Sequence, residues 1–213
     1  MKRTVLTALT LSMLIPVAAA SAQSCLGLPG LVRRPTNLLV NADFTDGAKS
    51  FGARLGFGTS IAFGGVGASL RTYDNISGTG FGVGVDGGLS LVGGPTQNIL
   101  FCPIASLSYG KPPSYFDYST TEASLGLAAG ATLKTSPGLD LIPFGSLSAV
   151  FDRFNFDNAR GRSTSDNYAQ LGLGLGFQLN PGLVLRPAFS TAIGRDGSKP
   201  VWSVGIGFPL GTR

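Results

Sequence analysis

The segment Ala169-Gln170-Leu171-Gly172-Leu173-Gly174-Leu175-Gly176-Phe177-Gln178-Leu179 decides the fold of this chain. Every second residue is apolar, and the residues between them are Gly or Gln. Because the side chains of a strand alternate between its two faces, one face of this strand is apolar and the other is almost bare. A soluble β-sandwich would carry charged residues on that second face. The pattern therefore favours the wall of a barrel whose outer surface contacts lipid.

The composition agrees with a barrel in a membrane. Only 13% of the 213 residues are charged and 32 are Gly, whereas a soluble domain has about 25% charged residues. After the first twenty residues no apolar stretch reaches the roughly 18 residues that a transmembrane helix needs. The length suits one domain.

The N-terminus has the pattern of a secretory signal peptide. Lys2 and Arg3 precede an apolar stretch, and Ala20-Ser21-Ala22 is a small-residue cleavage site. We expect residues 1–22 to be the signal peptide, 23–35 a periplasmic N-terminal segment and 36–213 the barrel. The alternatives are an uncleaved membrane anchor and lipidation of Cys25, although Gln23 fits a lipidation motif poorly.

Alternating runs bounded by turn residues predict about ten antiparallel strands in an up-and-down barrel. Eight strands are the alternative, in which residues 37–44 would lie outside the wall. In the third strand the alternation is unclear at Gly64-Gly65, where a β-bulge would let the two faces switch. The ten predicted strands are 37–44, 50–58, a third ending at Tyr73, 80–91, 99–109, 122–133, 141–154, 168–179, 183–192 and 201–210.

The connections between these strands predict which end of the barrel faces outward. Residues 59–60, 92–97, 134–138 and 180–182 are short connections, and generally longer polar ones lie between them at 74–79, 111–120, 155–167 and 194–200. Outer-membrane barrels have short periplasmic turns and longer external loops. An even number of strands then places both termini on the periplasmic side.

Aromatic residues near the strand ends predict two bands at the membrane interfaces. The external band is expected to contain Phe44, Phe51, Phe81, Tyr109 and Trp202, and the periplasmic band Phe57, Phe101, Phe177 and Phe208.

From about Thr36 onward the chain resembles the small outer-membrane β-barrel proteins of the OmpA-like and OmpX-like kind. The resemblance rests on the signal peptide, the repeated aromatic-x-Gly-x pattern and the last strand, Trp202-Ser203-Val204-Gly205-Ile206-Gly207-Phe208. The segment 101–109 also resembles a strand of such barrels. The last strand resembles the terminal signal that the barrel-insertion machinery reads, which implies that machinery as a partner. It departs from the family pattern because five residues follow Phe208.

Charged residues in the inward phase of the strands are the main candidates for a function of the interior. They are Asp43, Arg54, Arg71, Asp86, Glu122 and Arg186. A charge on the lipid face at mid-depth costs about 2–4 kcal/mol, so these side chains must point inward. They predict either salt bridges that plug the barrel or the lining of a narrow pore with a weak charge preference. The many small residues of the same face, such as Gly82 and Gly172, would leave room for water.

The two cysteines of this exported chain are expected to form a disulfide. Cys102 lies in the inward phase near the periplasmic start of its strand, and Cys25 lies in the N-terminal segment. A bond between them would tether residues 25–34 at or inside the periplasmic mouth as a partial plug. The alternative is two unrelated buried thiols.

The chain contains no histidine, which argues against an enzyme. A Ser or Thr nucleophile needs a general base, and a histidine zinc site is impossible. We therefore expect no catalytic residues, no metal and no cofactor. The match to G-x-G-x-x-G at residues 82–87 lies within a strand pattern, whereas a dinucleotide site needs a strand followed by a helix. The net charge of +5 forms no basic stripe, so no nucleic acid is expected as a partner.

These observations predict a monomeric barrel in the outer membrane of a Gram-negative bacterium, in contact with outer-membrane lipid. Its role would be structural or that of a narrow passive pore, with external loops such as residues 112–118 available for binding. The alternative is a soluble periplasmic β-barrel that binds a small apolar ligand, with the Leu and Phe face pointing inward.

Overall fold

The computed structural model describes residues 25–28, 36–59, 61–74, 76–92, 99–114, 116–156, 163–179 and 182–210. The predicted signal peptide lies outside the described residues, as does most of the predicted N-terminal segment. Among the described residues, no helix is long and apolar enough to cross a membrane.

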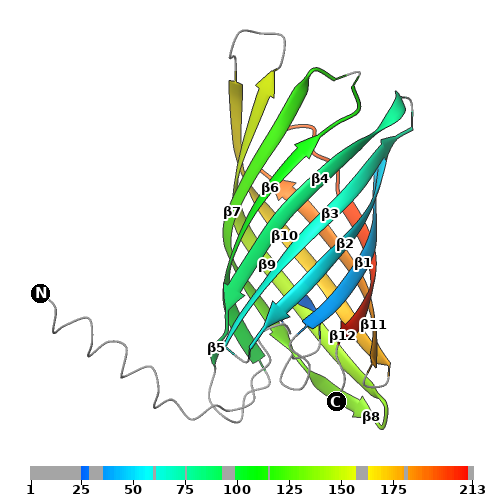
Figure 1. Cartoon of the computed structure of the whole chain (residues 1–213). Helices are drawn as coiled ribbons and strands as arrows, with labels where there is room; N and C mark the ends of the chain where they lie inside the picture. Colours follow the sequence, from blue (N-terminus) through cyan, green and yellow to red (C-terminus); the bar gives the residue numbers. More distant parts are fainter. Residues whose placement is uncertain are drawn as a thin grey trace, which may run out of the picture.

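Ten antiparallel strands close into a barrel, as the sequence predicts (Figure 1). Each strand pairs with its neighbour in sequence, and β1 pairs with β12 to complete the ring. The short strands β5 and β8 extend β4 and β7, because each pairs with the same neighbour as the strand before it. The bounds are β1 Thr36–Thr45, β2 Ala48–Gly58, β3 Ala62–Tyr73, β4 Ile76–Leu89, β5 Leu91–Val92, β6 Ile99–Lys111, β7 Tyr118–Ala131, β8 Leu133–Ser136, β9 Leu139–Phe156, β10 Ser163–Leu179, β11 Leu183–Ile193 and β12 Val201–Leu210.

The first strand belongs to the wall, which decides between ten strands and eight. β1 pairs with β2 along its whole length and with β12 from Thr36 to Phe44. Both β1 and β12 therefore have neighbours on each side, and no sheet edge is left unpaired between them. We call the end where β1 begins and β12 ends the lower end, as Figure 1 draws it, and the opposite end the upper end.

The expected bulge at Gly64-Gly65 is wrong. The pairing of β3 with β2 and β4 is regular there, and its register shifts only between Thr72 and Tyr73. The alternation looked unclear because Phe63 points inward and is buried with apolar residues at the lower end. A large apolar residue in the inward phase belongs to the packing inside the barrel and needs no switch of faces.

The expected alternation of loop lengths holds only for the later connections. The β1–β2 turn has two residues between its strands, and so does the β3–β4 connection, although a longer loop is expected at 74–79. Gly47 and Gly78 have positive φ angles of 80° and 113°, a conformation that glycine adopts without strain. The longer upper connections follow β6, β9 and β11.

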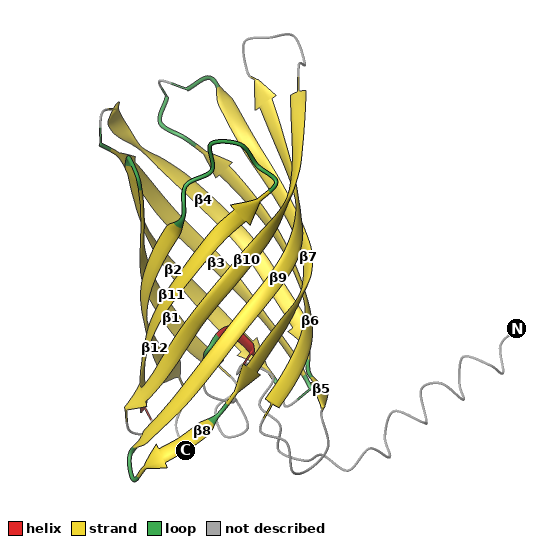
Figure 2. Ribbon diagram, turned by 180° about the vertical axis from the view of Figure 1, so that it is seen from behind, coloured by secondary structure: helices red, strands yellow, loops and turns green. Residues whose placement is uncertain are grey.

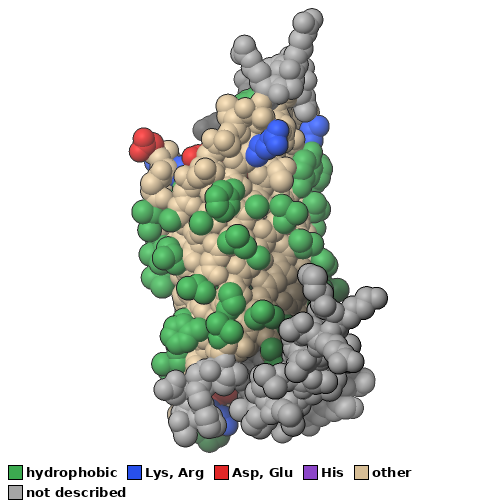
Figure 3. Space-filling model, turned by 90° about the vertical axis from the view of Figure 1, so that its left-hand side faces the viewer, with side chains coloured by type: hydrophobic (Ala, Val, Ile, Leu, Met, Phe, Trp, Pro, Cys, Tyr) green, Lys and Arg blue, Asp and Glu red, His purple; other side chains and the backbone are tan. Residues whose placement is uncertain are grey.

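The apolar face of the wall points outward. Figure 3 shows hydrophobic side chains over the wall between the two ends, whereas the charged side chains in this view lie toward the ends. The exposed residues include Val66, Leu107, Leu125, Leu147 and Ile206. This orientation is the opposite of the one that a soluble barrel with an apolar interior requires, and it is typical of a wall that contacts lipid.

We predict that an arginine in the middle of this surface destabilises the barrel. Leu125 lies at the centre of β7 and is 61% exposed, so Leu125→Arg should lower the free energy of unfolding in lipid vesicles by about 2–4 kcal/mol. Thr121→Arg, nearer the upper end of the same strand, should cost clearly less. Denaturant titrations followed by Trp202 fluorescence measure both. Equal losses from the two variants would contradict a lipid-facing wall.

Candidate functional site: the barrel interior

The inward face of the strands holds all six charged residues that the sequence places there. Their side chains are distributed at three heights, which the strand register defines. Asp43, Arg71 and Glu122 lie toward the upper end, Arg54 and Asp86 near the middle, and Arg186 lower. The structure brings Arg54 and Asp86 into contact and leaves the others apart.

The lower end of the interior is filled by an apolar plug that a disulfide attaches to the wall. The predicted bond between Cys25 and Cys102 is present, with a Cα–Cα distance of 6.2 Å. Cys25 and Leu28 are only 1% and 2% exposed, although they belong to a segment that precedes the barrel. The short turn at residues 25–26 is drawn in red within the barrel in Figure 2. The bond packs with Phe63, Leu100 and Ala128.

Glycines let this segment pass close to the wall. A Cβ atom on Gly27, which has a φ of +69°, would overlap the ring of Phe144. A Cβ atom on Gly176 of β10 would overlap the carbonyl oxygen of Gly27. Part of the small-residue face therefore accommodates the plug, where the sequence suggested space for water.

Arg186 fixes the plug from the opposite wall. Its Nε donates a hydrogen bond of 2.6 Å to the backbone oxygen of Leu26. Its guanidinium also lies 4.4 Å from the centre of the Phe144 ring, a distance at which a cation is attracted by the ring face. The charge predicted for the lower interior thus acts on the N-terminal segment.

Above the plug, Arg54 of β2 and Asp86 of β4 form a two-pronged ion pair over the inner face of β3. Nε and Nη2 of Arg54 donate hydrogen bonds of 2.6 Å and 2.5 Å to the two carboxylate oxygens. The Arg54 side chain is only 14% exposed. The guanidinium lies against Gly65, where a Cβ atom would overlap it. Glycine at this position of β3 is therefore part of the ion-pair geometry.

Asp43 accepts hydrogen bonds from neutral donors on three adjacent strands. Asn41 Nδ2 and Ser50 Oγ donate to it at 2.9 Å and 2.8 Å, and Ser203 Oγ donates from β12. The Ser203 bond crosses the seam where the first and last strands meet, and the Ser50 bond joins β1 to β2. They support barrel closure with side chains, in addition to the backbone ladder.

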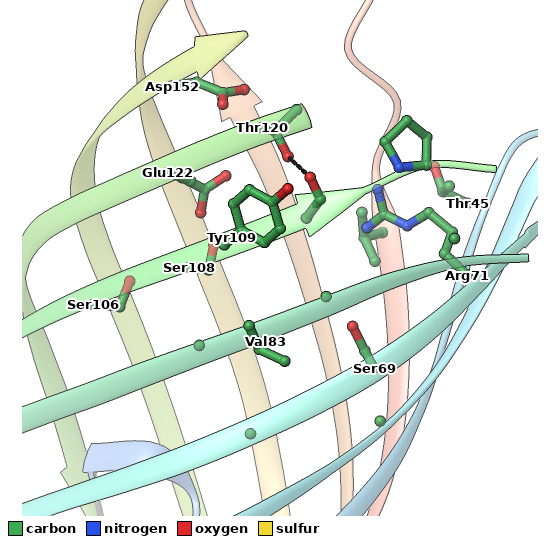
Figure 4. A pocket seen from close by; sticks show the side chains of 18 of the residues that line it. Thr45, Ser69, Arg71, Val83, Ser106, Ser108, Tyr109, Thr120, Glu122 and Asp152 are labelled. Carbon is green, nitrogen blue, oxygen red and sulfur yellow. Dashed lines mark hydrogen bonds between the residues drawn. The ribbon is translucent and has the colours of Figure 1, made fainter. Parts of the chain in front are cut away.

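The upper interior is hollow. A cavity of about 850 Å³ extends from the level of the Arg54–Asp86 pair to the upper mouth. Small residues such as Gly67, Ser69, Gly84 and Ser108 line much of its wall. Figure 4 shows Glu122 and Asp152 on one side of this space and Arg71 on the other.

Three carboxylates lie in one row at the upper mouth. Glu122 of β7 is directly opposite Asp152 of β9, which is directly opposite Asp166 of β10. Like charges at such positions destabilise a sheet. Arg195, from the β11–β12 connection, reduces this repulsion by pairing with Asp166 at 2.9 Å and with Asp152 at 3.3 Å. We call Glu122, Asp152 and Asp166 the acidic row.

Aromatic side chains accompany the acidic row. The Arg195 guanidinium lies 4.7 Å from the centre of the Tyr168 ring and 5.9 Å from that of Phe154. The Tyr168 hydroxyl donates a hydrogen bond of 3.3 Å to Glu122. Arg195 therefore has both carboxylates and ring faces as partners.

Four further residues of the interior were not predicted from the sequence: Asp152, Asp166, Tyr168 and Arg195. Asp152 shares the phase of Ile142 and Val150, which are fully buried, so the sequence did not reveal which face of β9 is inward. Asp166 and Arg195 fell in predicted loops. In the structure β9 continues to Phe156 and β10 begins at Ser163, so both strands reach into the predicted loop. A count of inward positions along both strands could have identified Asp152, but not the position of Arg195.

The residues predicted for the two aromatic bands point outward. At the upper end Phe44 pairs in register with Trp202, which also contacts Phe189 at 4.9 Å between ring centres. Phe81 and Tyr109 lie 6.3 Å apart on neighbouring strands. At the lower end Phe57 and Phe208 lie opposite Thr36 and Leu38; Phe101 is exposed and Phe177 half-buried.

The described residues contain no group of three or more His, Cys, Asp or Glu side chains arranged to hold a metal ion. Within the acidic row, the cationic partner is the guanidinium of Arg195.

We predict that Asp86→Asn destabilises the barrel, because it leaves the largely buried side chain of Arg54 without its charged partner. The loss in free energy of unfolding should stay below the roughly 3–5 kcal/mol of a fully buried pair, since both side chains line the cavity. Combining it with Arg54→Leu should recover part of the loss, since no unpaired charge then remains. Unfolding titrations of the two single variants and the double variant measure the coupling. Additive losses would show that the two side chains do not interact.

No protein-family model matches the chain, and no curated protein matches its sequence. Solved structures with a similar barrel include the N-terminal β-barrel domain of Pseudomonas aeruginosa OprF (11% identity, TM-score 0.39, 81% of this chain and 95% of that chain). Others are the Neisserial surface protein A (15% identity, TM-score 0.40, 83% and 97%) and the translocator domain of the autotransporter NalP from Neisseria meningitidis (15% identity, TM-score 0.49, 82% and 87%). The chain thus resembles outer-membrane β-barrels in architecture.

Proposed function

We propose that this chain is a structural protein of the bacterial outer membrane, a monomeric barrel whose interior is closed at the periplasmic end by its own N-terminal segment. The main support for this proposal is the plug formed by residues 25–28. Cys25 and Leu28 are almost completely buried inside the lower end, and a disulfide and the Arg186–Leu26 hydrogen bond attach the segment to opposite sides of the wall. Contacts of this kind restrict passage of solutes through the interior.

Outer-membrane lipid is the environment that the outer surface fits. The exposed apolar side chains form a continuous band, with aromatic residues toward both ends. The closed ring gives each strand two neighbours, so the wall offers no free edge for pairing with a second copy. This supports a monomer. The last strand, with Trp202 and Phe208 exposed on the outer face, is the segment that the barrel-insertion machinery would read.

The upper mouth would then face the outside of the cell. It carries the longer connections after β6, β9 and β11. In the first of these, Phe116 packs against Tyr73 at 5.8 Å between ring centres and against Tyr118 at the same distance. This connection is therefore held against the rim of the barrel. The absence of histidine from the sequence supports a role without catalysis.

Cell fractionation tests the location. The protein should appear in the outer-membrane fraction, and the folded form should migrate differently from the heat-denatured form on a denaturing gel, because a closed barrel resists unfolding by detergent. Recovery from the soluble periplasm would contradict the proposal and favour a soluble ligand-binding barrel.

Planar-bilayer recordings test the closed interior. Oxidised protein should show no steady openings, because the disulfide holds the plug in place. The large chamber above the plug favours a passive pore as the second candidate function, so recordings should be repeated with dithiothreitol. Openings that appear only after reduction would show that the tether closes the barrel.

A variant with Cys25→Ser and Cys102→Ser is the matched control, since the reductant should then have no effect. Closed recordings under all conditions would also support the structural role, with Arg186 and Leu28 holding the plug unaided. Steady conductance of the oxidised protein would overturn it in favour of the pore.

A further inference from the structure

The acidic row has fewer cations in contact with it than its carboxylates require. Glu122, Asp152 and Asp166 occupy directly opposed positions on three neighbouring strands, and Arg195 pairs with only two of them. Glu122 accepts its hydrogen bond from a neutral donor, Tyr168. The sheet therefore holds negative charge at this point of the mouth at a cost in repulsion.

One carboxylate oxygen of Asp152 lacks a hydrogen-bond donor among the described residues. The residue is only 6% exposed, and its Oδ2 accepts from Arg195. Its other oxygen, Oδ1, is buried and has no hydrogen-bond partner among the described residues. A buried carboxylate oxygen without a donor is costly. Asp152 lines the cavity (Figure 4), so a donor on a bound molecule could reach this side of the wall.

The contacts of Arg195 indicate which chemical group the acidic row can bind. Its guanidinium reaches two carboxylates and lies near the rings of Tyr168 and Phe154. Carboxylates together with aromatic faces are the surroundings that a guanidinium prefers, because it is planar, weakly hydrated and carries several donors. The site is thus built for a guanidinium and is occupied by one from the same chain.

The connection that carries Arg195 is attached to the barrel by few bonds. It includes Gly194 and Gly197, with φ angles of +81° and +70°. Within it, Ser198 N donates to Arg195 O at 3.4 Å. Ser198 Oγ donates to Ala192 O at 3.4 Å, and at the far end of the connection Thr45 Oγ1 donates to Pro200 O at 3.0 Å. Lys199 at its end pairs with Asp46 on the exposed rim, where an ion pair contributes little. Displacing Arg195 therefore breaks little else.

The remaining charges of the cavity define the orientation of a ligand. Arg71, Lys111 and Lys199 line other parts of the space, and Asp196 lies beside Arg195. Arg71 faces the acidic row across the cavity (Figure 4). A cationic group entering the mouth is therefore directed to the wall formed by β7, β9 and β10.

We propose that the acidic row binds the guanidinium group of small organic cations that enter from the upper mouth, in exchange with Arg195. The bound guanidinium would pair with Asp152 and Asp166 and lie against Tyr168, and with the Arg195 side chain displaced a further donor would reach Asp152 Oδ1. Arg195 acts as an internal competitor. The affinity of the wild-type site is consequently reduced by the fraction of molecules in which Arg195 occupies it.

The test uses purified full-length protein refolded in detergent, so its result does not depend on membrane location or conductance. The probes are L-argininamide and L-citrullinamide, in which a neutral urea replaces the guanidinium while the α-amino group is kept, and calorimetric titration measures binding. Arg195→Ala should bind L-argininamide at least about tenfold more tightly than the wild type, because the competitor is removed. Neither protein should bind L-citrullinamide. Adding Asp166→Asn to Arg195→Ala should abolish binding.

Arg153→Ala is the matched control. Arg153 follows Asp152 on β9 but is exposed on the outer face, where Nη2 donates to Ser163 at 3.3 Å, so its removal should leave the affinity at the wild-type value. Should Arg195→Ala not show the heat-dependent gel shift of a folded barrel, Arg195→Gln replaces it. Equal affinity of the wild type and the Arg195 variant, or equal binding of the two probes, would overturn the proposal.

Discussion

The closure of β1 against β12 is the constraint on which the rest of this structure depends. A wall that exposes Leu, Val and Phe to lipid has no water on that side to satisfy backbone N–H and C=O groups, so every strand needs two neighbours. The register from Thr36 to Phe44 supplies the last of these pairings. Asp43 adds a side-chain hydrogen bond across the same seam, from Ser203 of β12, and a second one from Ser50 of β2.

Once the ring is closed, the interior must accommodate whatever the inward positions carry, and this barrel does so differently along its length. At the lower end, apolar residues and the tethered N-terminal segment form a small core. In the middle, Arg54 and Asp86 neutralise each other over Gly65. At the upper end the space stays open, and the acidic row is balanced by Arg195 from a connection. From the lower end to the upper end, the interior therefore changes from packed apolar side chains to an ion pair and then to an open cavity.

The sequence predicted the ten strands well because period-two alternation is a local property, and because one face of each strand is consistently apolar. It also placed Asp43, Arg54, Arg71, Asp86, Glu122 and Arg186 inward, since charges are excluded from the lipid face. It was wrong where the inward face is itself apolar, as at Phe63, and where strands continue beyond the membrane-facing part, as in β9 and β10. There the contrast between the two faces, on which the prediction depends, disappears.

What the sequence determined by itself is the wall in outline: about ten alternating strands with one apolar face, the inward charges, and a disulfide expected from two exported cysteines. The structure decided for ten strands over eight and for an outward apolar face. Only the tertiary structure decided which inward groups meet. Arg54 and Asp86 are 32 residues apart and Arg195 and Asp152 are 43 residues apart, and their contacts depend on strand register and barrel curvature together. Whether a glycine leaves space or accommodates a guanidinium depends likewise on the side chains of the neighbouring strands, as Gly65 and Arg54 show, because alternation along one strand carries no information about which side chain packs over it inside the barrel.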